Sequence, residues 1–180
     1  MICGEPWGGI PVRSRCTHGG RPAWRRGVYR FAFQATWISH ALVAGTFFAF
    51  SAFVMAALSR MDPAMAARMM NSINVAIVRS PFIPLFLFSA VMSVVLPIWA
   101  WRVEGRLSVG LAISGASYLL GILVVTATLN VPMNDRLAAS DSAQLAQAWA
   151  SYAGPWTAWN HVRTLAGILS ILGLSLTAKG

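Results

Sequence analysis

The residues best suited to chemistry lie in two short polar stretches, NVPMNDRL at 130–137 and WTAWNHVRT at 156–164. If the second stretch is helical, Asn160 and Arg163 lie one turn apart on the same face. A histidine, hydrogen-bonding groups and aromatic walls could together hold a flat ligand. Tryptophan, arginine and histidine near the end of a membrane span are also common interfacial anchors, and that interpretation stays open. The candidate residues of the two stretches are Asn130, Asn134, Asp135, Trp156, Trp159, Asn160, His161 and Arg163.

A third polar cluster lies in the stretch MMNSINVAIVRSPF at 69–82. Asn71 and Asn74 are three residues apart and therefore share a helical face. Asn74 joins the candidate binding residues on this ground. A charge inside a membrane span normally faces the protein interior and has a partner, so Asp135 is the expected partner of Arg163.

The composition indicates that membrane-spanning helices position these clusters. The 180 residues are 57% hydrophobic and 11% charged, whereas ordinary soluble domains are roughly 45–50% apolar and 25% charged. About 20 apolar residues are needed to cross a bilayer as a helix. Runs of about this length predict an all-α fold, a four-helix transmembrane bundle with spans at about 35–58, 82–101, 107–130 and 161–178.

Small residues at helical spacing predict which faces of three spans pack together. Such residues let helix backbones approach closely in lipid, where apolar burial no longer drives association. The predicted contact faces are Ala41, Gly45, Ala49, Ala52 and Ala56 in the first span, Gly110, Ser114, Ser117 and Gly121 in the third, and Ala166, Ser170, Gly173 and Thr177 in the fourth.

The basic residues predict the orientation in the cell membrane. The net charge is +9, and six of the fourteen Lys and Arg residues precede the first span. The positive-inside rule then places the N-terminus and, by parity, the C-terminus in the cytoplasm. A nucleic-acid interface would need a folded basic face, so the expected partner is the lipid bilayer and no nucleic acid.

Residues 1–30 are predicted to form a disordered basic tail, and residues 31–180 the transmembrane domain. Cys3 and Cys16 lie in the tail and are expected to be free thiols rather than a disulfide or metal site. His40 lies near the inner end of the predicted first span and is interpreted as an interface or packing histidine. No metal-ligand spacing or cofactor motif is present in the sequence, so no metal and no cofactor are predicted.

The two long connections, on the non-cytoplasmic side, are predicted to contain short interfacial helices. Asp62 and Pro63 are an N-cap and first-turn signal, and a second helix is expected from Asp141 to Gly154 and Pro155. Proline at 132 is expected to end the third span. By parity, the three polar clusters then meet at one membrane surface, which predicts a shared site.

In this order and spacing, the stretches GTFFAFSAFVMAAL, MMNSINVAIVRSPF, NVPMNDRL and WTAWNHVRT resemble the anthrone oxygenase-like family of small four-helix membrane proteins. The resemblance covers about residues 40–178, and the last two stretches are its most specific part. Fungal members of that family oxidise polyketide anthrones to anthraquinones without a metal or flavin. Many bacterial members are uncharacterised, so the resemblance implies a fold more firmly than an activity.

The resemblance implies a possible mechanism, in which a base deprotonates an anthrone-like or other C–H-acidic aromatic and the resulting anion reacts with dioxygen. His161 would be the base, Asn160, Asn134 or Arg163 would stabilise the oxyanion, and Trp156 and Trp159 would pack on the rings. A small lipophilic aromatic is then the expected ligand of a cofactor-independent oxygenase. The alternative is a non-catalytic membrane binding or accessory subunit, and a transporter is less favoured because charges at mid-membrane depth are missing.

Overall fold

The computed structural model describes residues 23–177, and every regular element in that range is a helix. Most of the predicted tail, with Cys3 and Cys16, lies outside the described residues. The first helix, α1 (Ala23–Ala49), begins inside the stretch predicted as tail, so residues 23–30 are helical.

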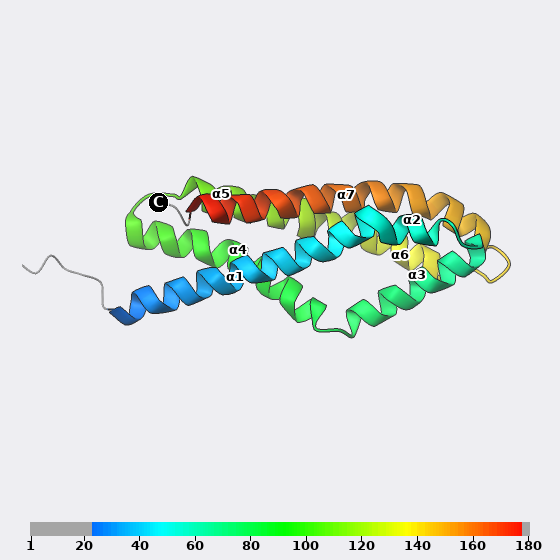
Figure 1. Ribbon diagram of the computed structural model, residues 1–180, viewed down its shortest axis with the longest axis horizontal. Helices are drawn as coiled ribbons and strands as arrows, with labels where there is room; N and C mark the ends of the chain where they lie inside the picture. The colour runs from blue at the N-terminus through cyan, green and yellow to red at the C-terminus, as the bar shows by residue number, and fades with distance from the viewer. Residues whose placement is uncertain (1–22, 178–180) are drawn as a thin grey trace, which may run out of the picture.

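The chain folds into long rods joined by short turns (Figure 1). Helix α1 continues without a break through η1 (Phe50–Val54) and α2 (Met55–Leu58). A turn leads into α3 (Pro63–Val78), which meets α4 (Phe82–Glu104) at a corner. The next rod is continuous and comprises α5 (Val109–Ala116), η2 (Ser117–Val124), η3 (Thr126–Asn130) and α6 (Val131–Ala138), and the last rod is α7 (Leu145–Thr177).

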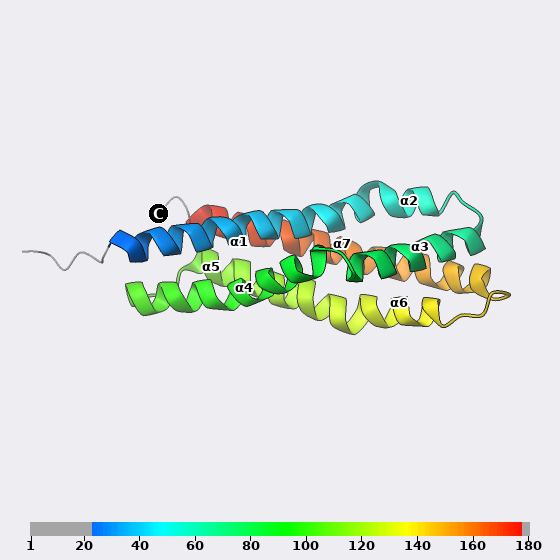
Figure 2. The same cartoon turned by 90° about the horizontal axis from the view of Figure 1, so that it is seen from below.

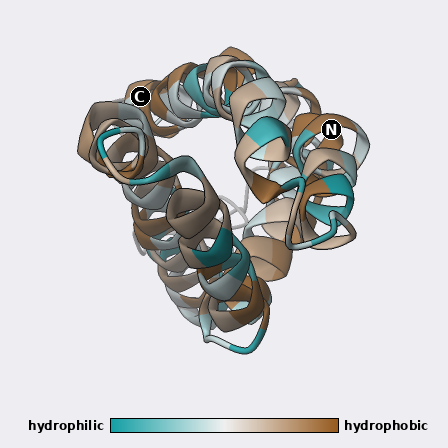
Figure 3. Ribbon diagram, turned by 90° about the vertical axis from the view of Figure 1, so that its right-hand side faces the viewer, coloured by the Kyte–Doolittle hydropathy of each residue, from teal (hydrophilic) through white to brown (hydrophobic). Residues whose placement is uncertain are grey.

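The rods lie side by side along one axis, which gives the molecule two distinct ends (Figures 1 and 2). We call the end formed by residues 23–33, 99–109 and 171–177 the terminal end, and the end formed by residues 55–66 and 134–150 the loop end. Viewed from the loop end, the helices surround a common axis (Figure 3). In cross-section α1 packs on α4 and α7, and α5 packs on the same two helices.

Three helical stretches among the described residues are long and apolar enough to cross a membrane: Gly27–Leu58, Phe82–Val103 and Val109–Ala138. No more than about a third of each is buried inside the protein, so most of their apolar side chains face outward, as lipid-facing side chains do. These stretches match the first three predicted spans, with longer ends. Helix α7 is not among the three stretches, and the polar residues Asn160, His161 and Arg163 lower its hydropathy.

The predicted start of the helix at Asp62 is confirmed. The Asp62 side chain accepts a hydrogen bond from the Met65 amide at 3.0 Å, and Pro63 occupies the first turn. This bond satisfies one of the amide groups that a helix start leaves free.

The prediction that two prolines end helices is wrong. The third rod continues through Pro132 to Ala138, and α7 continues through Pro155 to Thr177. Pro132 lies two residues after the π-helical segment η3, at the change from π-helical to α-helical geometry. Tyr152 and Trp156, on either side of Pro155, are both buried in the loop-end core, and this packing holds the helix together across the proline.

Two of the three predicted contact faces meet each other. Ser114 and Ser170 place their hydroxyl oxygens 3.0 Å apart, and the α-carbon of Gly173 lies against the backbone of α5 at Gly110 and Ser114. The predicted face of the first span is wrong, because Gly45, Ala52 and Ala56 are exposed. Helix α1 instead packs through another face, which carries Thr36, His40, Val43, Ala44 and Phe47, and Ala44 lies against Gly167 of α7.

His40 is the centre of a buried polar network that joins the rods. Only 1% of the residue is exposed, and its ring stacks on Tyr118 with a centroid separation of 4.5 Å. Its Nδ1 lies 2.7 Å from the Ser170 hydroxyl of α7, and Nε2 lies 3.3 Å from the Ser89 carbonyl of α4. Because a carbonyl only accepts, Nε2 carries the proton. The Ser170 hydroxyl lies between Nδ1 and the Ser114 carbonyl, to which it donates at 3.1 Å. The packing interpretation of His40 therefore agrees with the structure, but the residue lies near the middle of Gly27–Leu58 rather than near its end.

We expect His40→Ala to lower the free energy of unfolding by about 1–3 kcal/mol, because it leaves buried hydroxyl and carbonyl groups without a partner. The measurement is thermal unfolding of the detergent-solubilised protein. His161→Ala is the matched control, since that histidine is exposed and should leave the midpoint unchanged. Equal midpoints for the two variants would contradict the role of the network.

Candidate functional site

Three π-helical segments interrupt the α-helical geometry of the first and third rods. They are η1, η2 and η3, and such segments are rare and often occur at functional sites. Segments η1 and η3 both contact α7. They carry Ser51 in η1 and Thr126 and Asn130 in η3, and these polar residues approach α7 near Asn160 and Arg163.

Arg163 is a buried cation on α7, with 4% of the residue exposed. Its guanidinium donates to the Asn160 side-chain oxygen at 2.9 Å and to the Thr126 hydroxyl at 3.4 Å. The carbon of the guanidinium lies 4.4 Å from the ring centre of Phe47 and 5.1 Å from that of Trp156, both within the range of cation–π attraction. The Nε–H is buried and has no hydrogen-bond partner in the structure.

Asn160 fixes the position of Arg163. Its side-chain amide donates to the Phe47 carbonyl and to the Ser51 hydroxyl, both at 2.8 Å. These two bonds orient the amide so that its oxygen faces the guanidinium. Thr164 donates to the Asn160 carbonyl at 3.0 Å and lies 2.9 Å from Ser51, which ties η1 to α7 at this level.

Asn134 on α6 is held by two aromatic donors. Its side-chain oxygen accepts from the Tyr152 hydroxyl at 2.7 Å and from the Trp156 indole at 2.9 Å. Burial raises the pKa of Tyr152, and Asn74 and the charge on Arg163 oppose that shift only in part. The phenol therefore stays protonated and keeps donating to Asn134, so the amide hydrogens of Asn134 remain available for other contacts.

Arg163, Asn134 and Trp156 border a cavity of about 480 Å³ beneath the corner between α3 and α4. We call it the Arg163 pocket. Its volume falls in the range of small-molecule sites, which are mostly apolar with a few placed polar groups. The polar lining consists of Thr46, Asn71, Asn74, Arg79, Thr126, Asn134, Asp135 and Arg163, and the aromatic lining of Phe47, Phe50, Phe82, Phe86 and Trp156.

The structure brings together most of the residues that the sequence singled out. Asn74, Asn134, Asp135, Trp156 and Arg163 all line the Arg163 pocket. Asn130 and Asn160 are fully buried behind it, where Asn130 donates to the Trp156 carbonyl at 3.3 Å.

His161 and Trp159 are not brought to the pocket. His161 is exposed, Trp159 is 38% exposed, and neither lines the cavity. The reason is helical geometry, since successive residues on a helix point about 100° apart. Asn160 and Arg163 face the interior, and the two residues that flank Asn160 therefore face outward.

The partners of Arg163 differ from the expected one. Asp135 lines the same pocket, but the guanidinium hydrogen bonds go to Asn160 and Thr126. Phe47, Ser51, Thr126 and Tyr152 take part in the site although the sequence analysis did not select them. Phe47 and Ser51 lie in a stretch whose sequence is typical of any membrane span. No pattern in that stretch distinguishes a residue that faces a ligand from one that faces lipid.

The remaining hydrogen-bonding capacity of the site indicates what it can bind. Among the described side chains, the buried atoms without a partner are Arg163 Nε, Asn74 Nδ2, Asn71 Oδ1 and Asn130 Oδ1. Buried polar groups normally have partners, and each exception calls for an explanation. Two of these four are donors on residues that line the pocket, and one of them is cationic. The lining also places the guanidinium of Arg163 beside the rings of Phe47 and Trp156, a combination suited to a flat apolar ligand that carries an oxygen acceptor or an oxyanion.

Within residues 23–177, no three His, Cys, Asp or Glu side chains come close enough together to hold a metal ion.

The fold and the pocket define the class of the protein: a helical membrane protein with a buried cationic site between its rods. The chain belongs to the anthrone oxygenase family, because the family model described as "Anthrone oxygenase" matches residues 69–173, more than half of its length. This match includes all of the pocket lining except the three residues on the first rod, Thr46, Phe47 and Phe50. No curated protein and no solved structure shows significant similarity to the chain.

Proposed function

We propose that the protein is a membrane-embedded oxygenase that binds a lipophilic, C–H-acidic aromatic of the anthrone type in the Arg163 pocket. The observation that carries this proposal is Arg163 itself, a buried cation between two aromatic rings whose Nε–H has no partner. The hydrogen-bond partners of the guanidinium, Asn160 and Thr126, are neutral, so an oxyanion bound in the pocket would supply the counter-charge. The family to which the chain belongs supports the choice of reaction.

The reaction balances with dioxygen as the only oxidant. A base removes one proton from the methylene carbon, and the charge spreads onto the ring carbonyl oxygen as an enolate. The carbon then forms a bond to dioxygen and gives a peroxide, which takes up a proton. Loss of the second methylene proton cleaves the O–O bond, so that the carbon becomes a carbonyl and hydroxide leaves as water. One dioxygen is consumed for each quinone.

The enolate is the species that the pocket would stabilise. A preorganised donor in a site shielded from water stabilises developing charge more than it stabilises the neutral ground state. Arg163 is preorganised by Asn160 and Thr126, and Asn74 and Asn134 add neutral donors. The five aromatic residues of the lining would pack on the rings of the substrate.

Asp135 is the carboxylate among the described lining residues, and we assign it the role of base. His161, which the sequence favoured for this role, is exposed outside the lining and would need another route to the substrate. Asp135 lies where the pocket meets the surface, so a proton that it accepts can pass to water.

The proposal includes the four-helix architecture and the orientation. Residues 161–178 would form the fourth span, with Arg163 and Asn160 shielded from lipid by the other rods. The basic residues that precede the first span support an orientation in which both chain ends would lie in the cytoplasm. The Arg163 pocket then opens toward the opposite side of the membrane.

The test is turnover by membranes that contain the protein, with a panel of anthrones, measured as quinone formed and dioxygen consumed above autoxidation. We expect a ratio of one to one, and Arg163→Met should lower the rate by roughly 10²- to 10³-fold, the usual cost of losing an oxyanion donor. Arg163→Lys should recover only part of the rate, because an ammonium group does not reproduce the planar donor set.

Two outcomes would each contradict this proposal. If the wild-type protein oxidises no member of the panel, the pocket belongs to a binding or accessory subunit. If Arg163→Met turns over at the wild-type rate while remaining folded, the guanidinium does not stabilise the reacting anion.

A further inference from the structure

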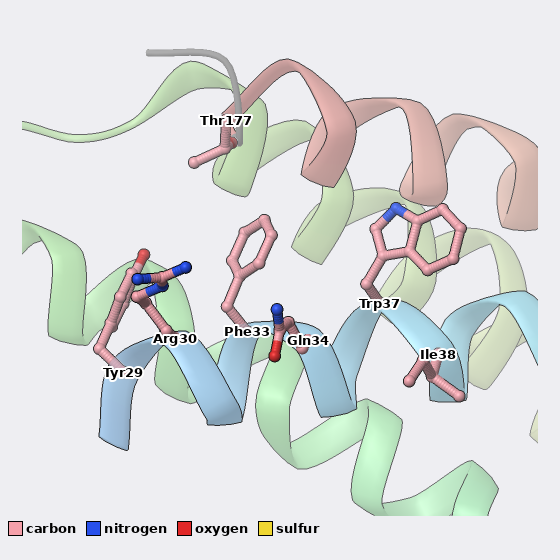
Figure 4. Close-up of a pocket in the computed structure, with 7 residues that line it drawn as sticks. All are labelled: Tyr29, Arg30, Phe33, Gln34, Trp37, Ile38 and Thr177. Atoms are coloured by element: carbon pink, nitrogen blue, oxygen red, sulfur yellow. The ribbon is translucent and has the colours of Figure 1, made fainter. Parts of the chain in front are cut away.

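A second cavity, of about 700 Å³, lies at the terminal end, far from the Arg163 pocket. We call it the terminal groove. It is lined by Tyr29, Arg30, Phe33, Gln34, Trp37 and Ile38 of α1 and by Thr177 at the end of α7. Figure 1 shows α1 diverging from α7 toward this end, and Figure 4 shows Phe33 and Trp37 pointing from α1 toward α7 across the groove. The Trp37 indole donates to Ser175 of α7 at 3.2 Å and closes the inner part of the groove.

The groove changes from cationic to apolar with depth. Tyr29 packs edge-on against Trp99 with a centroid separation of 5.5 Å, which places Arg30 at the level of the tryptophans of α4. Tryptophan and tyrosine mark the headgroup layer of membranes. From Arg30 to Ile38 the helix advances by about 12 Å toward the middle of the bundle. The groove therefore offers a guanidinium at headgroup depth and aromatic and aliphatic side chains at acyl-chain depth.

The charge of this end selects an anionic headgroup. Arg25, Arg30, Arg102 and Arg106 belong to the terminal end, and Glu104 is the acidic residue of the same end. No acidic side chain is among the described residues that line the groove. A basic residue near a membrane surface attracts anionic lipid with about 1 kcal/mol.

We propose that the terminal groove is a binding site for one anionic phospholipid, with its phosphate on Arg30 and an acyl chain against Phe33 and Trp37. The apolar depth of the groove distinguishes this ligand from free phosphate, which would leave Phe33 and Ile38 uncovered. The cationic mouth distinguishes it from a neutral lipid. The site is separate from the Arg163 pocket, and its failure would leave the proposed oxygenase function unaffected.

The test is photo-crosslinking in vesicles that contain equal amounts of phosphatidylglycerol and phosphatidylcholine with acyl chains of different mass. A benzophenone amino acid replaces Phe33, which lines the groove, or Phe31, which is 74% exposed on the other face of the same helix. Mass spectrometry of the crosslinked peptide gives the ratio of the two lipids. At position 33 we expect phosphatidylglycerol to be enriched about fivefold, the factor that corresponds to 1 kcal/mol. At position 31 the ratio should equal that of the vesicle.

Two arginine variants test the headgroup contact. Arg30→Gln should return the ratio at position 33 to that of the vesicle, whereas Arg25→Gln, one to two turns away and outside the lining, should keep the enrichment. Arg30→Lys should keep it as well, because a point charge is sufficient for a phosphate. Equal labelling by both lipids at position 33, enrichment that survives Arg30→Gln, or crosslinks to the protein chain itself instead of lipid would each overturn the proposal.

Discussion

Asp135→Asn is expected to lower the rate of anthrone oxidation by roughly 10²- to 10⁴-fold, the usual contribution of a general base. Asparagine has nearly the same shape but cannot accept the methylene proton at neutral pH. Asp135 is exposed where it borders the pocket, so the substitution leaves the core unchanged and the protein should fold and insert as before. The measurement is initial rate of quinone formation at saturating substrate, with thermal unfolding as the check on folding.

His161→Ala is the matched comparison for this experiment. Its side chain is exposed and lies outside the pocket lining, so the variant should keep the wild-type rate. The opposite pattern, with His161→Ala inactive and Asp135→Asn active, would restore the histidine as the base and would require the substrate to reach the outer face of α7. The pair therefore distinguishes Asp135 from His161 as the base, and wild-type rates in both variants would exclude both residues.

Gly173→Leu is expected to destabilise the protein by at least about 3 kcal/mol, at the upper end of the usual cost of overpacking. A side chain at this position would place its first carbon 2.6 Å from the Gly110 carbonyl oxygen and 2.8 Å from the Ser114 amide nitrogen. Both are backbone atoms, which cannot rotate away as a side chain can. Helices α5 and α7 would have to separate, and the Ser114–Ser170 contact would be lost.

Gly45→Leu is the control for this prediction, because nothing lies within 4 Å of the corresponding position and the residue is exposed. Thermal unfolding in detergent should show a large loss for Gly173→Leu and little change for Gly45→Leu. Similar midpoints for the two variants would show that the close approach of α5 and α7 is not required.

The sequence predicted the features that depend on local chemistry or on a strong pattern. The N-cap at Asp62 is one such feature, and the small faces of the third and fourth predicted spans are another. Both follow from rules that involve few residues. The selection of Asn160 and Arg163 as inward-facing partners also followed from helical spacing, and the two residues do contact each other.

Other features depend on geometry that no sequence pattern records. The π-helical segments shift the register of the first and third rods, and this shift decides that Ser51 and Thr126 face α7. The first rod packs through His40, Phe47 and Ala44, and only Ala44 is a small residue, one that lies outside the predicted face. His161 was selected for its chemistry, but its place next to the inward-facing Asn160 turns it outward.

The length of α7 has a consequence for where the reaction would take place. Its 33 residues extend for about 50 Å, whereas the hydrocarbon core of a bilayer measures about 30 Å. If the tryptophans of the terminal end lie in one headgroup layer, Arg163 lies in the half of the hydrocarbon core that is farther from that layer. The mouth of its pocket at Asp135 then lies near the boundary with water on the other side of the membrane. Dioxygen and an apolar substrate both concentrate in the hydrocarbon and could enter from the side, while protons and water leave on the aqueous side. The pocket would thus separate its reactants from its polar by-products by partitioning alone.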